Sequence, residues 1–381
     1  MATTEAAQGV LRIDPAEPGL NLYCGDRAPI AIHPLWLRER CRDPASIDAR
    51  TEQRLYNPAD LDPDLSIASV SALPENRFAI AFSDGHEAVF GADAIIDELD
   101  RSGGGGIPCP LPWTSRLKDM PVFQWAETPP PSLLSDMLER FLTLGFIIVN
   151  GVPSEDGAVL KVARAFGFPR ETNFGVLFDV RSTQDAQDLA YTSLALDPHT
   201  DNPYRTPVPG IQLLHCLTNR TEGGLSTLVD GLAVAEALRA EDPEAFAVLN
   251  RTPVRFRYID AGVELVAAEP LIACDAHGRF TAIHFSPRLD FVPLLPRAEL
   301  SAFYRARRML DGMFRSDRFA LRFKLDDGNL MMFDNRRLLH GRTDFDPAEG
   351  PRHLQGCYID IDGPRSLYRV LHRRLRDSAD R

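Results

Sequence analysis

Three short segments of the sequence carry side chains that could hold a metal ion and an anion. His199 and Asp201 stand two residues apart, and on an extended segment this spacing points both side chains to the same side. His340 follows an expected strand at 330–334 and stands beside a glycine. Arg352 opens the last expected strand, where burying its charge would be costly without an anionic partner.

Each segment has an ordinary explanation when it is taken alone. A His-x-Asp pair arises by chance, a histidine at a strand end more often makes a structural hydrogen bond, and an arginine there often forms a salt bridge. Together, two histidines and one aspartate on a β scaffold form the ligand set of non-haem Fe(II) oxygenases, which leaves open positions on the metal. Arg352, twelve positions after His340, can hold the remote carboxylate of 2-oxoglutarate by a fork of hydrogen bonds.

The first part of the chain predicts a small N-terminal β-rich domain. Turn residues separate short runs that are rich in β-branched and aromatic side chains. The expected strands cover 11–13, 67–70, 77–82 and 87–90. Asp84 and Gly85 predict a hairpin turn between the last two strands, and 94–99 predicts a closing helix.

A glycine run followed by prolines predicts a boundary between two domains. The glycines lie at 103–106, and such a segment is partly flexible and partly stiff. The expected organisation is therefore a small β-rich domain at 1–105, a linker at 106–131 and a catalytic domain at 132–381.

The second domain is predicted to be mainly β with supporting helices. Apolar residues at helical spacing predict helices at 132–144, 157–166, 232–241 and 299–313. The expected strands cover 146–150, 212–216, 226–229, 252–258, 271–274, 281–284, 320–324, 330–334 and 354–361. Many strands with a few helices indicate a sandwich or barrel rather than alternating βαβ units.

The composition argues against several classes of protein. The 381 residues are 44% apolar and 25% charged, with a formal net charge of −12. We find no apolar run of membrane-helix length, no secretory leader pattern and no large basic cluster, so we expect neither a membrane nor a nucleic-acid partner. Six cysteines without regular spacing fit a protein of the reducing cytoplasm.

The sequence resembles the γ-butyrobetaine and trimethyllysine dioxygenases of the Fe(II)/2-oxoglutarate class, best over 145–361. The resemblance is carried by FDNRRLLHGR at 333–342, RHLQGCYID at 352–360, PGIQLLHC at 209–216 and GGLSTLVDG at 223–231. It implies a double-stranded β-helix, or jelly roll, that acts as a homodimer and uses O2 on a small-molecule substrate.

The resemblance also implies roles for single residues. His199, Asp201 and His340 would hold Fe(II), and Arg352 would bind the C5 carboxylate of 2-oxoglutarate. Ser226 stands where related dioxygenases support this co-substrate with Thr or Asn, and its hydroxyl can still donate a hydrogen bond.

The N-terminal domain is similar to the family's zinc module, in which three cysteines and one histidine surround a structural zinc. This chain keeps Cys41 and His86, but Asp43 and Ser46 stand at the other cysteine positions. Structural zinc normally takes four N or S ligands. We therefore expect no zinc here, with Cys41 as a packed thiol and His86 as a turn residue.

The family surrounds a trimethylammonium group with aromatic faces, which attract a cation. The matching positions are Phe174, Phe178, Tyr191 and Tyr358, and all are aromatic. From spacing alone, the two phenylalanines would be core residues and the two tyrosines ordinary strand residues. The resemblance favours a cage instead.

The other end of the expected substrate site departs from the family. Where relatives hold the carboxylate of γ-butyrobetaine, this chain has Asp188 and Asn202. An aspartate would repel a carboxylate by about 1 to 4 kcal/mol. We therefore expect a different distal group, such as a phosphonate, with Arg288 as a candidate anchor.

These observations predict an Fe(II)/2-oxoglutarate-dependent dioxygenase that hydroxylates a C–H bond of a small quaternary-ammonium substrate and releases succinate and CO2. Two alternatives stay open. One is a dioxygenase of the same superfamily that acts on an amino acid or a sulfonate, with the aromatic residues in the core. The other is a non-catalytic β scaffold that binds a small molecule, although such a module has no use for the whole ligand set together with Arg352.

Overall fold

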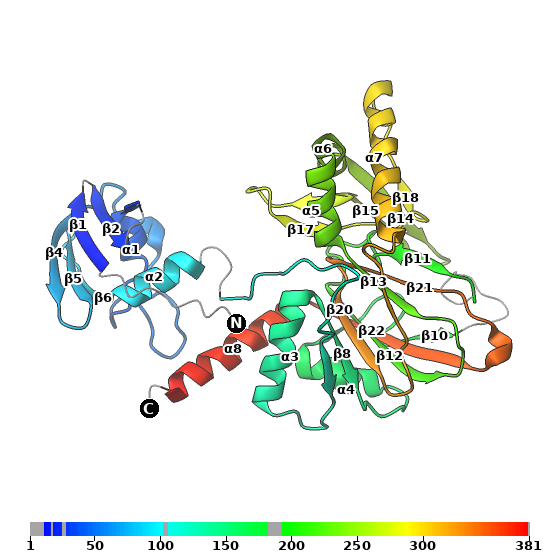
Figure 1. The fold of residues 1–381 in the computed structure, drawn as a ribbon. Helices are drawn as coiled ribbons and strands as arrows, with labels where there is room; N and C mark the ends of the chain where they lie inside the picture. Colours follow the sequence, from blue (N-terminus) through cyan, green and yellow to red (C-terminus); the bar gives the residue numbers. More distant parts are fainter. Residues whose placement is uncertain (1–10, 17, 25–27, 102–105, 182–192, 380–381) are drawn as a thin grey trace. The chain divides into compact units, whose positions relative to one another are not determined.

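The computed structural model describes residues 11–16, 18–24, 28–101, 106–181 and 193–379. The chain divides into two compact units, Met1–Gly106 and Ile107–Arg381. Figure 1 shows the path of the chain within each unit. Each unit packs around apolar residues of its own. In the described part of the chain, no helix combines the length and the apolar character needed to cross a membrane.

The smaller unit contains two antiparallel three-stranded sheets, with the orders β1-β2-β3 and β4-β5-β6. The elements are β1 (Leu11–Ala16), β2 (Gly19–Cys24), β3 (Ile30–Ile32), α1 (Pro34–Arg38), β4 (Ile67–Leu73), β5 (Arg77–Phe82), β6 (Glu87–Gly91) and α2 (Ala92–Arg101). The predicted hairpin is confirmed as β5 and β6. Buried and exposed residues alternate along both strands because one face packs on the core. The sequence patterns missed β2 and β3.

The larger unit is mainly β and is built on two sheets. The larger sheet has the order β10-β22-β12-β20-β8-β7, with β9 beside β22, and the smaller sheet has the order β11-β21-β13-β19. The larger sheet consists of β7 (Val122–Gln124), β8 (Phe146–Asn150), β9 (Pro169–Arg170), β10 (Phe178–Arg181), β12 (Ile211–Asn219), β20 (Leu330–Asp334) and β22 (Arg352–Ile359). The smaller sheet consists of β11 (Leu196–His199), β13 (Ser226–Asp230), β19 (Leu321–Phe323) and β21 (Leu338–Arg342).

Apolar side chains of the two sheets pack against each other. Phe146 and Phe333 of the larger sheet share one cluster with Leu228 and Leu338 of the smaller sheet. A second cluster joins the larger sheet to three helices, α3 (Pro131–Leu144), α4 (Ala158–Phe166) and α8 (Asp362–Ala379). Because both of its faces are covered, the central strand β20 is buried along almost its whole length.

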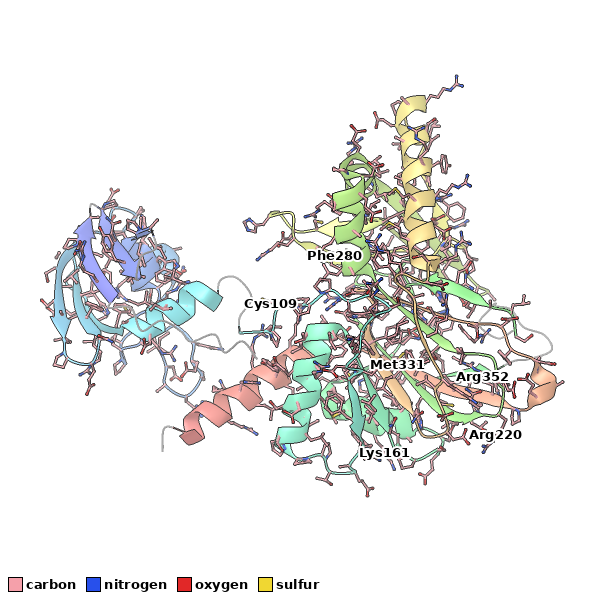
Figure 2. All side chains as sticks on the ribbon, in the orientation of Figure 1. Cys109, Lys161, Arg220, Phe280, Met331 and Arg352 are labelled. Carbon is pink, nitrogen blue, oxygen red and sulfur yellow. The ribbon has the colours of Figure 1, made fainter. Side chains whose placement is uncertain are left out.

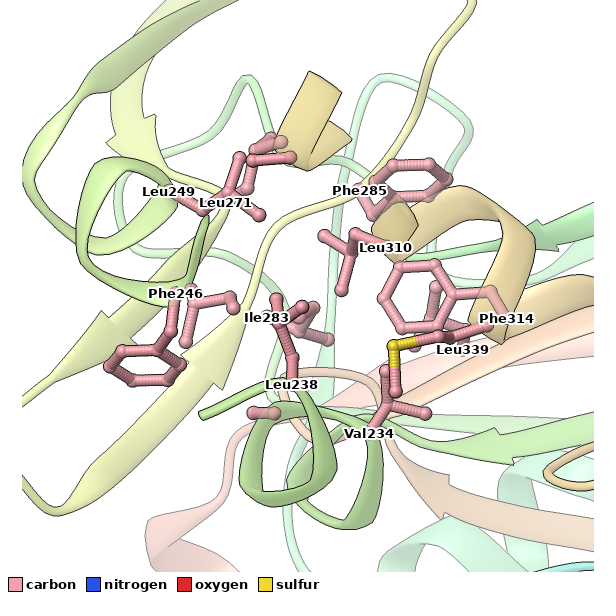
Figure 3. Packing of buried hydrophobic residues seen from close by; sticks show 14 of the residues in the cluster. Val234, Leu238, Phe246, Leu249, Leu271, Ile283, Phe285, Leu310, Phe314 and Leu339 are labelled. Carbon is pink, nitrogen blue, oxygen red and sulfur yellow. The ribbon is translucent and has the colours of Figure 1, made fainter. Parts of the chain in front are cut away.

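Three further helices support the other end of this unit (Figure 1). They are α5 (Gly231–Glu241), α6 (Pro243–Arg251) and α7 (Arg297–Arg315), and they pack near the strands β14 (Pro253–Ile259), β15 (Glu264–Pro270), β16 (Ile272–Cys274), β17 (Phe280–Ile283) and β18 (Asp290–Phe291). Figure 3 shows their shared core, in which Leu310 and Phe314 of α7 lie near Phe285, and Leu238 of α5 lies near Ile283. Val229 and Leu339 of the smaller sheet belong to the same core, so these helices pack against that sheet.

The segment that we expected to be a linker is, from residue 107 onward, part of the larger unit. Trp113 is buried, and its indole N–H donates to the carbonyl of Leu144 at 2.7 Å. Its backbone N–H donates to Asp230 at 3.0 Å, and β7 pairs with β8 in parallel. A count of glycines and prolines indicates an irregular chain, but it does not reveal that one buried tryptophan fixes that chain to a sheet.

Candidate active site

The three candidate metal ligands come from two paired strands. β11 and β21 are antiparallel, and His199 lies opposite His340 in their register. The centroids of the two imidazole rings are 4.5 Å apart. Asp201 follows β11 by two residues. We expected His340 to follow a strand, whereas it lies within β21 and thereby faces its partner histidine directly.

The ligand atoms of the triad converge. Nε2 of His199 lies 3.5 Å from Oδ1 of Asp201, and Nε2 of His340 lies 3.9 Å from Oδ2 of the same carboxylate. Nδ1 of His199 lies 2.9 Å from the carbonyl of Asp197, which can only accept, so this nitrogen carries the proton. The lone pair of Nε2 is therefore left for a metal ion.

The charge states of the triad suit metal binding. Burial raises the pKa of Asp201, but the two imidazoles and the hydroxyl of Tyr358 outweigh that effect and hold the pKa below its usual value. Burial lowers the pKa of His340 to about 3. At neutral pH Asp201 is thus a carboxylate and His340 a neutral imidazole, which are the forms that coordinate a divalent cation.

Asn335 fixes the backbone of Asp201. Its side-chain oxygen accepts from the N–H of Asp201 at 2.8 Å, and its side-chain nitrogen donates to the carbonyl of Asp201 at 2.9 Å. The same nitrogen also donates to the carbonyl of Pro209 at 3.1 Å. Asn335 is fully buried, so these hydrogen bonds are shielded from water. Sequence reasoning missed this residue, although it stands within the 333–342 motif.

The predicted anion-binding residue Arg352 opens β22 (Figure 2) and is 9% exposed. Burial lowers its pKa, and among the described residues no acidic side chain forms an ion pair with it. Gly224 makes room for it, since a Cβ on this glycine would lie 2.9 Å from Nε of Arg352. Ser226 of β13 lies in the same cavity. A buried guanidinium without an acidic partner favours the binding of an anion.

A second buried arginine, Arg342, was missed by the sequence reasoning. It follows His340 by two residues on β21, so both side chains lie on the same face of the strand. Its guanidinium donates to the carbonyl of Leu194 at 2.8 Å. The ring of Phe345 lies 5.1 Å from the guanidinium carbon of Arg342 and 5.5 Å from that of Arg352. Burial and the charge of Arg352 lower the pKa of Arg342 to about 10.

Two aromatic side chains form a wall beside the triad. Phe178 of β10 pairs with Gly356 of β22, and a Cβ on Gly356 would lie 2.4 Å from the ring of Phe178. Because Gly356 has no side chain, the ring of Phe178 can lie over β22, 5.2 Å from the ring of Tyr358. The hydroxyl of Tyr358 donates to Oδ2 of Asp201 at 2.8 Å.

A further aromatic group lines the same cavity. The ring of Tyr258 stacks on that of Tyr204 at 5.0 Å, and the ring of Phe174 meets Tyr258 edge-on at 5.6 Å. Sequence reasoning predicted Phe174 but missed both tyrosines. Tyr204 stands three residues after Asp201, which is a usable signal, whereas Tyr258 reaches the site from the distant strand β14.

One cavity of about 350 Å³ brings most of the predicted residues together. The predicted residues that line it are His199, Asp201, His340, Arg352, Ser226, Phe174, Phe178, Tyr358, Asn202 and Arg288. The predicted Tyr191 and Asp188 lie outside the described residues. Gln212, Tyr204, Tyr258 and Arg342 also line the cavity and were not predicted.

A second cluster of potential ligands lies in the smaller unit. Ligand atoms of Cys41, Asp43 and His86 lie within 4.8 Å of one another, and Nε2 of His86 is 3.0 Å from Oδ2 of Asp43. Burial raises the pKa of the Cys41 thiol to about 11. The guanidinium of Arg38 donates to the hydroxyl of Ser46 at 3.1 Å, so a fixed positive charge already stands beside this cluster.

The cavity of the larger unit thus has the ligand set of a non-haem iron oxygenase, with buried arginines placed to receive an acidic co-substrate. The family described as "Taurine catabolism dioxygenase TauD, TfdA family" matches residues 110–358. The chain belongs to this family of dioxygenases. The predicted enzyme class, an Fe(II)/2-oxoglutarate-dependent dioxygenase, and its predicted cofactors are thereby confirmed.

Curated relatives span almost the whole chain. A γ-butyrobetaine dioxygenase of Pseudomonas sp. (strain AK-1) is 37% identical over 93% of this chain and 94% of the relative. Dioxygenase str8 of Strobilurus tenacellus is 31% identical over 86% of this chain and 82% of the relative. The mitochondrial trimethyllysine dioxygenase of Mus musculus is 28% identical over 88% of this chain and 82% of the relative. The resemblance that the sequence motifs indicate is confirmed.

Proposed function

We propose that the cavity binds a small quaternary-ammonium compound and that the enzyme hydroxylates one of its C–H bonds. The observation that carries this proposal is the aromatic wall of Phe178 and Tyr358 directly beside the metal ligands. Aromatic faces attract a cation that cannot donate hydrogen bonds, and they exclude water from it. The names of the curated γ-butyrobetaine and trimethyllysine dioxygenases support the same substrate class.

In this proposal His199, Asp201 and His340 hold Fe(II). The bound metal supplies the activation of O2 that converts 2-oxoglutarate to succinate and CO2 and oxidises the substrate C–H bond. Arg352 orients the co-substrate by pairing with its C5 carboxylate, and the hydroxyl of Ser226 donates a hydrogen bond to it. The buried aromatic wall keeps water away from the reacting carbon.

The distal end of the substrate faces a polar part of the cavity. Asn202 is buried, and both Asn202 and Arg288 line the same cavity. An N–H donor and a guanidinium favour an oxygen-rich group such as a carboxylate or a phosphonate. We propose that these two residues select such a group.

A matched pair of substrates tests the cationic end. Succinate formation is compared between trimethylammonium acids or phosphonates and analogues in which a neutral tert-butyl group replaces the ammonium group. We expect the neutral analogue to lose about 5- to 30-fold in kcat/KM, which corresponds to a cation–π energy of about 1 to 2 kcal/mol. Equal turnover of both would contradict the cage, and turnover of amino acids or sulfonates alone would favour the alternative substrate class.

A matched pair of variants tests the wall itself. Phe178→Leu removes an aromatic face from the cavity, whereas Phe168→Leu changes a side chain that is 91% exposed. We expect Phe178→Leu to raise the KM for the ammonium substrate about 5- to 30-fold and to leave the KM for the co-substrate unchanged. Phe168→Leu should change neither value.

The fold type, the division into domains, the location in the cell and the oligomeric state also belong to this proposal. The two facing sheets are consistent with a double-stranded β-helix, and the smaller unit is consistent with a separate N-terminal domain. The five cysteines whose side chains the structure describes are free thiols, as is typical of the cytoplasm. A cytoplasmic location and a homodimer stay predictions.

A further inference from the structure

One tyrosine takes part in both halves of the site. Tyr358 is 4% exposed, its ring is a wall of the cavity, and its hydroxyl donates to the carboxylate of Asp201. We propose that Tyr358 is a positioning residue that couples a cation on the aromatic wall to the metal-ligand carboxylate. The half of this inference that concerns the cation rests on the proposed function, whereas the half that concerns the metal does not.

The metal half follows from how Asp201 is held. Asn335 fixes its backbone through both the N–H and the carbonyl, so only the side-chain rotation is left to be set. The hydroxyl of Tyr358 sets that rotation by a charge-assisted hydrogen bond to Oδ2. Oδ1 then remains at 3.5 Å from Nε2 of His199, which presents an oxygen and a nitrogen lone pair to one metal. Partners of this kind orient metal ligands and tune their basicity.

The cation half follows from the electronic character of a phenol. A hydrogen bond donated to a carboxylate pushes electron density into the ring, and so strengthens the attraction of its face for a cation. A cation on that face in turn makes the hydroxyl a stronger donor and draws electron density from Asp201. Because coupling between two binding sites is reciprocal, a cation on the wall must then change the affinity of the site for Fe(II).

The chain offers a matched control for the hydroxyl group. Tyr368 of α8 is also buried, and its hydroxyl also donates to a carboxylate, that of Glu139. Tyr368 does not line the cavity. Tyr358→Phe and Tyr368→Phe therefore delete the same atom from the same kind of hydrogen bond, once beside the metal ligands and once away from them.

The test is an anaerobic titration of the metal-free protein with Fe(II) in the presence of 2-oxoglutarate, followed by the visible charge-transfer band. We expect Tyr358→Phe to weaken Fe(II) binding about 10-fold and Tyr368→Phe to leave it unchanged. Adding tetramethylammonium should change the Fe(II) affinity of the wild-type protein but not that of Tyr358→Phe. tert-Butanol, a neutral probe of similar size, should change neither.

The outcomes separate this inference from the proposed function. Wild-type Fe(II) affinity in Tyr358→Phe overturns the coupling, whatever the substrate is. If tetramethylammonium binds to the wild-type protein without changing its Fe(II) affinity, the coupling is overturned, and this holds even if Tyr358→Phe does not fold. If tetramethylammonium does not bind to the wild-type protein at all, the proposed substrate class is overturned instead.

Discussion

Two places in the described parts of the chain bring three potential metal ligands within 4.8 Å of one another, and their surroundings differ. The triad of His199, Asp201 and His340 lines a cavity. The cluster of Cys41, Asp43 and His86 lies in the smaller unit, beside the guanidinium of Arg38. The potential ligand atoms are therefore similarly close together in both groups, but the charged side chains around them differ.

The two groups differ in the protonation states that their ligands have before a metal binds. In the triad, the pKa of Asp201 lies below its usual value and that of His340 is about 3, so both ligands are deprotonated at neutral pH. In the cluster, the pKa of the Cys41 thiol is about 11, and the thiol donates to the carbonyl of Leu37. This thiol must lose its proton before it binds a metal, and burial makes that loss costly. The expected lack of zinc is supported by this contrast and stays a prediction.

The largest expected effect comes from removing one histidine from each group. His340→Ala should abolish the anaerobic Fe(II)/2-oxoglutarate absorption band and lower succinate formation by at least roughly 1,000-fold, because it removes a ligand of the catalytic metal. His86→Ala should leave both within about twofold. Full activity in His340→Ala would disprove the assignment of the triad, and a lost band in His86→Ala would show that the two groups are not independent.

The next effect concerns the anion that the triad cavity is built to receive. Arg352→Leu should raise the KM for the co-substrate about 10- to 100-fold, since a charge-assisted fork of hydrogen bonds contributes about 1.5 to 3 kcal/mol. Arg220→Leu is the control, because the side chain of Arg220 is 64% exposed and its guanidinium pairs with Asp327. An unchanged KM in Arg352→Leu would indicate that the co-substrate binds to another cationic side chain of the cavity.

A smaller effect is expected where the backbone shapes the aromatic wall. Gly356→Ala places a Cβ against the ring of Phe178 and should raise the KM for an ammonium substrate about 5- to 30-fold by displacing that ring. Gly262→Ala is the control, because a Cβ there meets open space. The Fe(II) titration should be unchanged in both variants, and a weakened titration in Gly356→Ala would show that the wall and the triad cannot be separated.

The smallest effect tests the cluster of the smaller unit through pH. Burial raises the pKa of Asp43, but hydrogen bonds and the neighbouring His86 lower it more, so the folded pKa lies below the usual value. The carboxylate therefore stabilises the fold above about pH 4, and this contribution is lost as the pH falls through the folded pKa.

Asp43→Asn should accordingly cost about 0.5 to 1 kcal/mol of unfolding free energy at pH 7, and the difference should shrink as the pH falls below about 4 and vanish below the folded pKa of Asp43. Hydrogen exchange of the amides in 28–101 measures it at both pH values. A metal chelator should change neither protein. A chelator that weakened protection in the wild-type protein would show that the cluster holds a metal after all.

The site was more predictable than the elements that carry it. His199, Asp201, His340 and Arg352 were predicted because their residue types and spacing suit one chemistry. The strand β21 was missed because its residues are buried on both faces and show no alternation. The helix α8 was missed because most of its side chains are polar or charged, so the few apolar residues that pack near α3 and α4 form no clear pattern in the sequence.

The residues that only the fold brings into the cavity gave no local signal. Tyr258 lies on β14, far from the other site residues in the sequence. Arg342 is recognisable as part of the site only because it lines the cavity and lies, together with Arg352, near the ring of Phe345. By itself, the sequence determined the family, and it was enough to propose the ligand set and the co-substrate cation, because ligand chemistry depends on residue types at short spacing. The tertiary structure decided which of two similar clusters has the charge states of a metal site, because burial, neighbouring charges and hydrogen bonds set those states once distant segments have packed together.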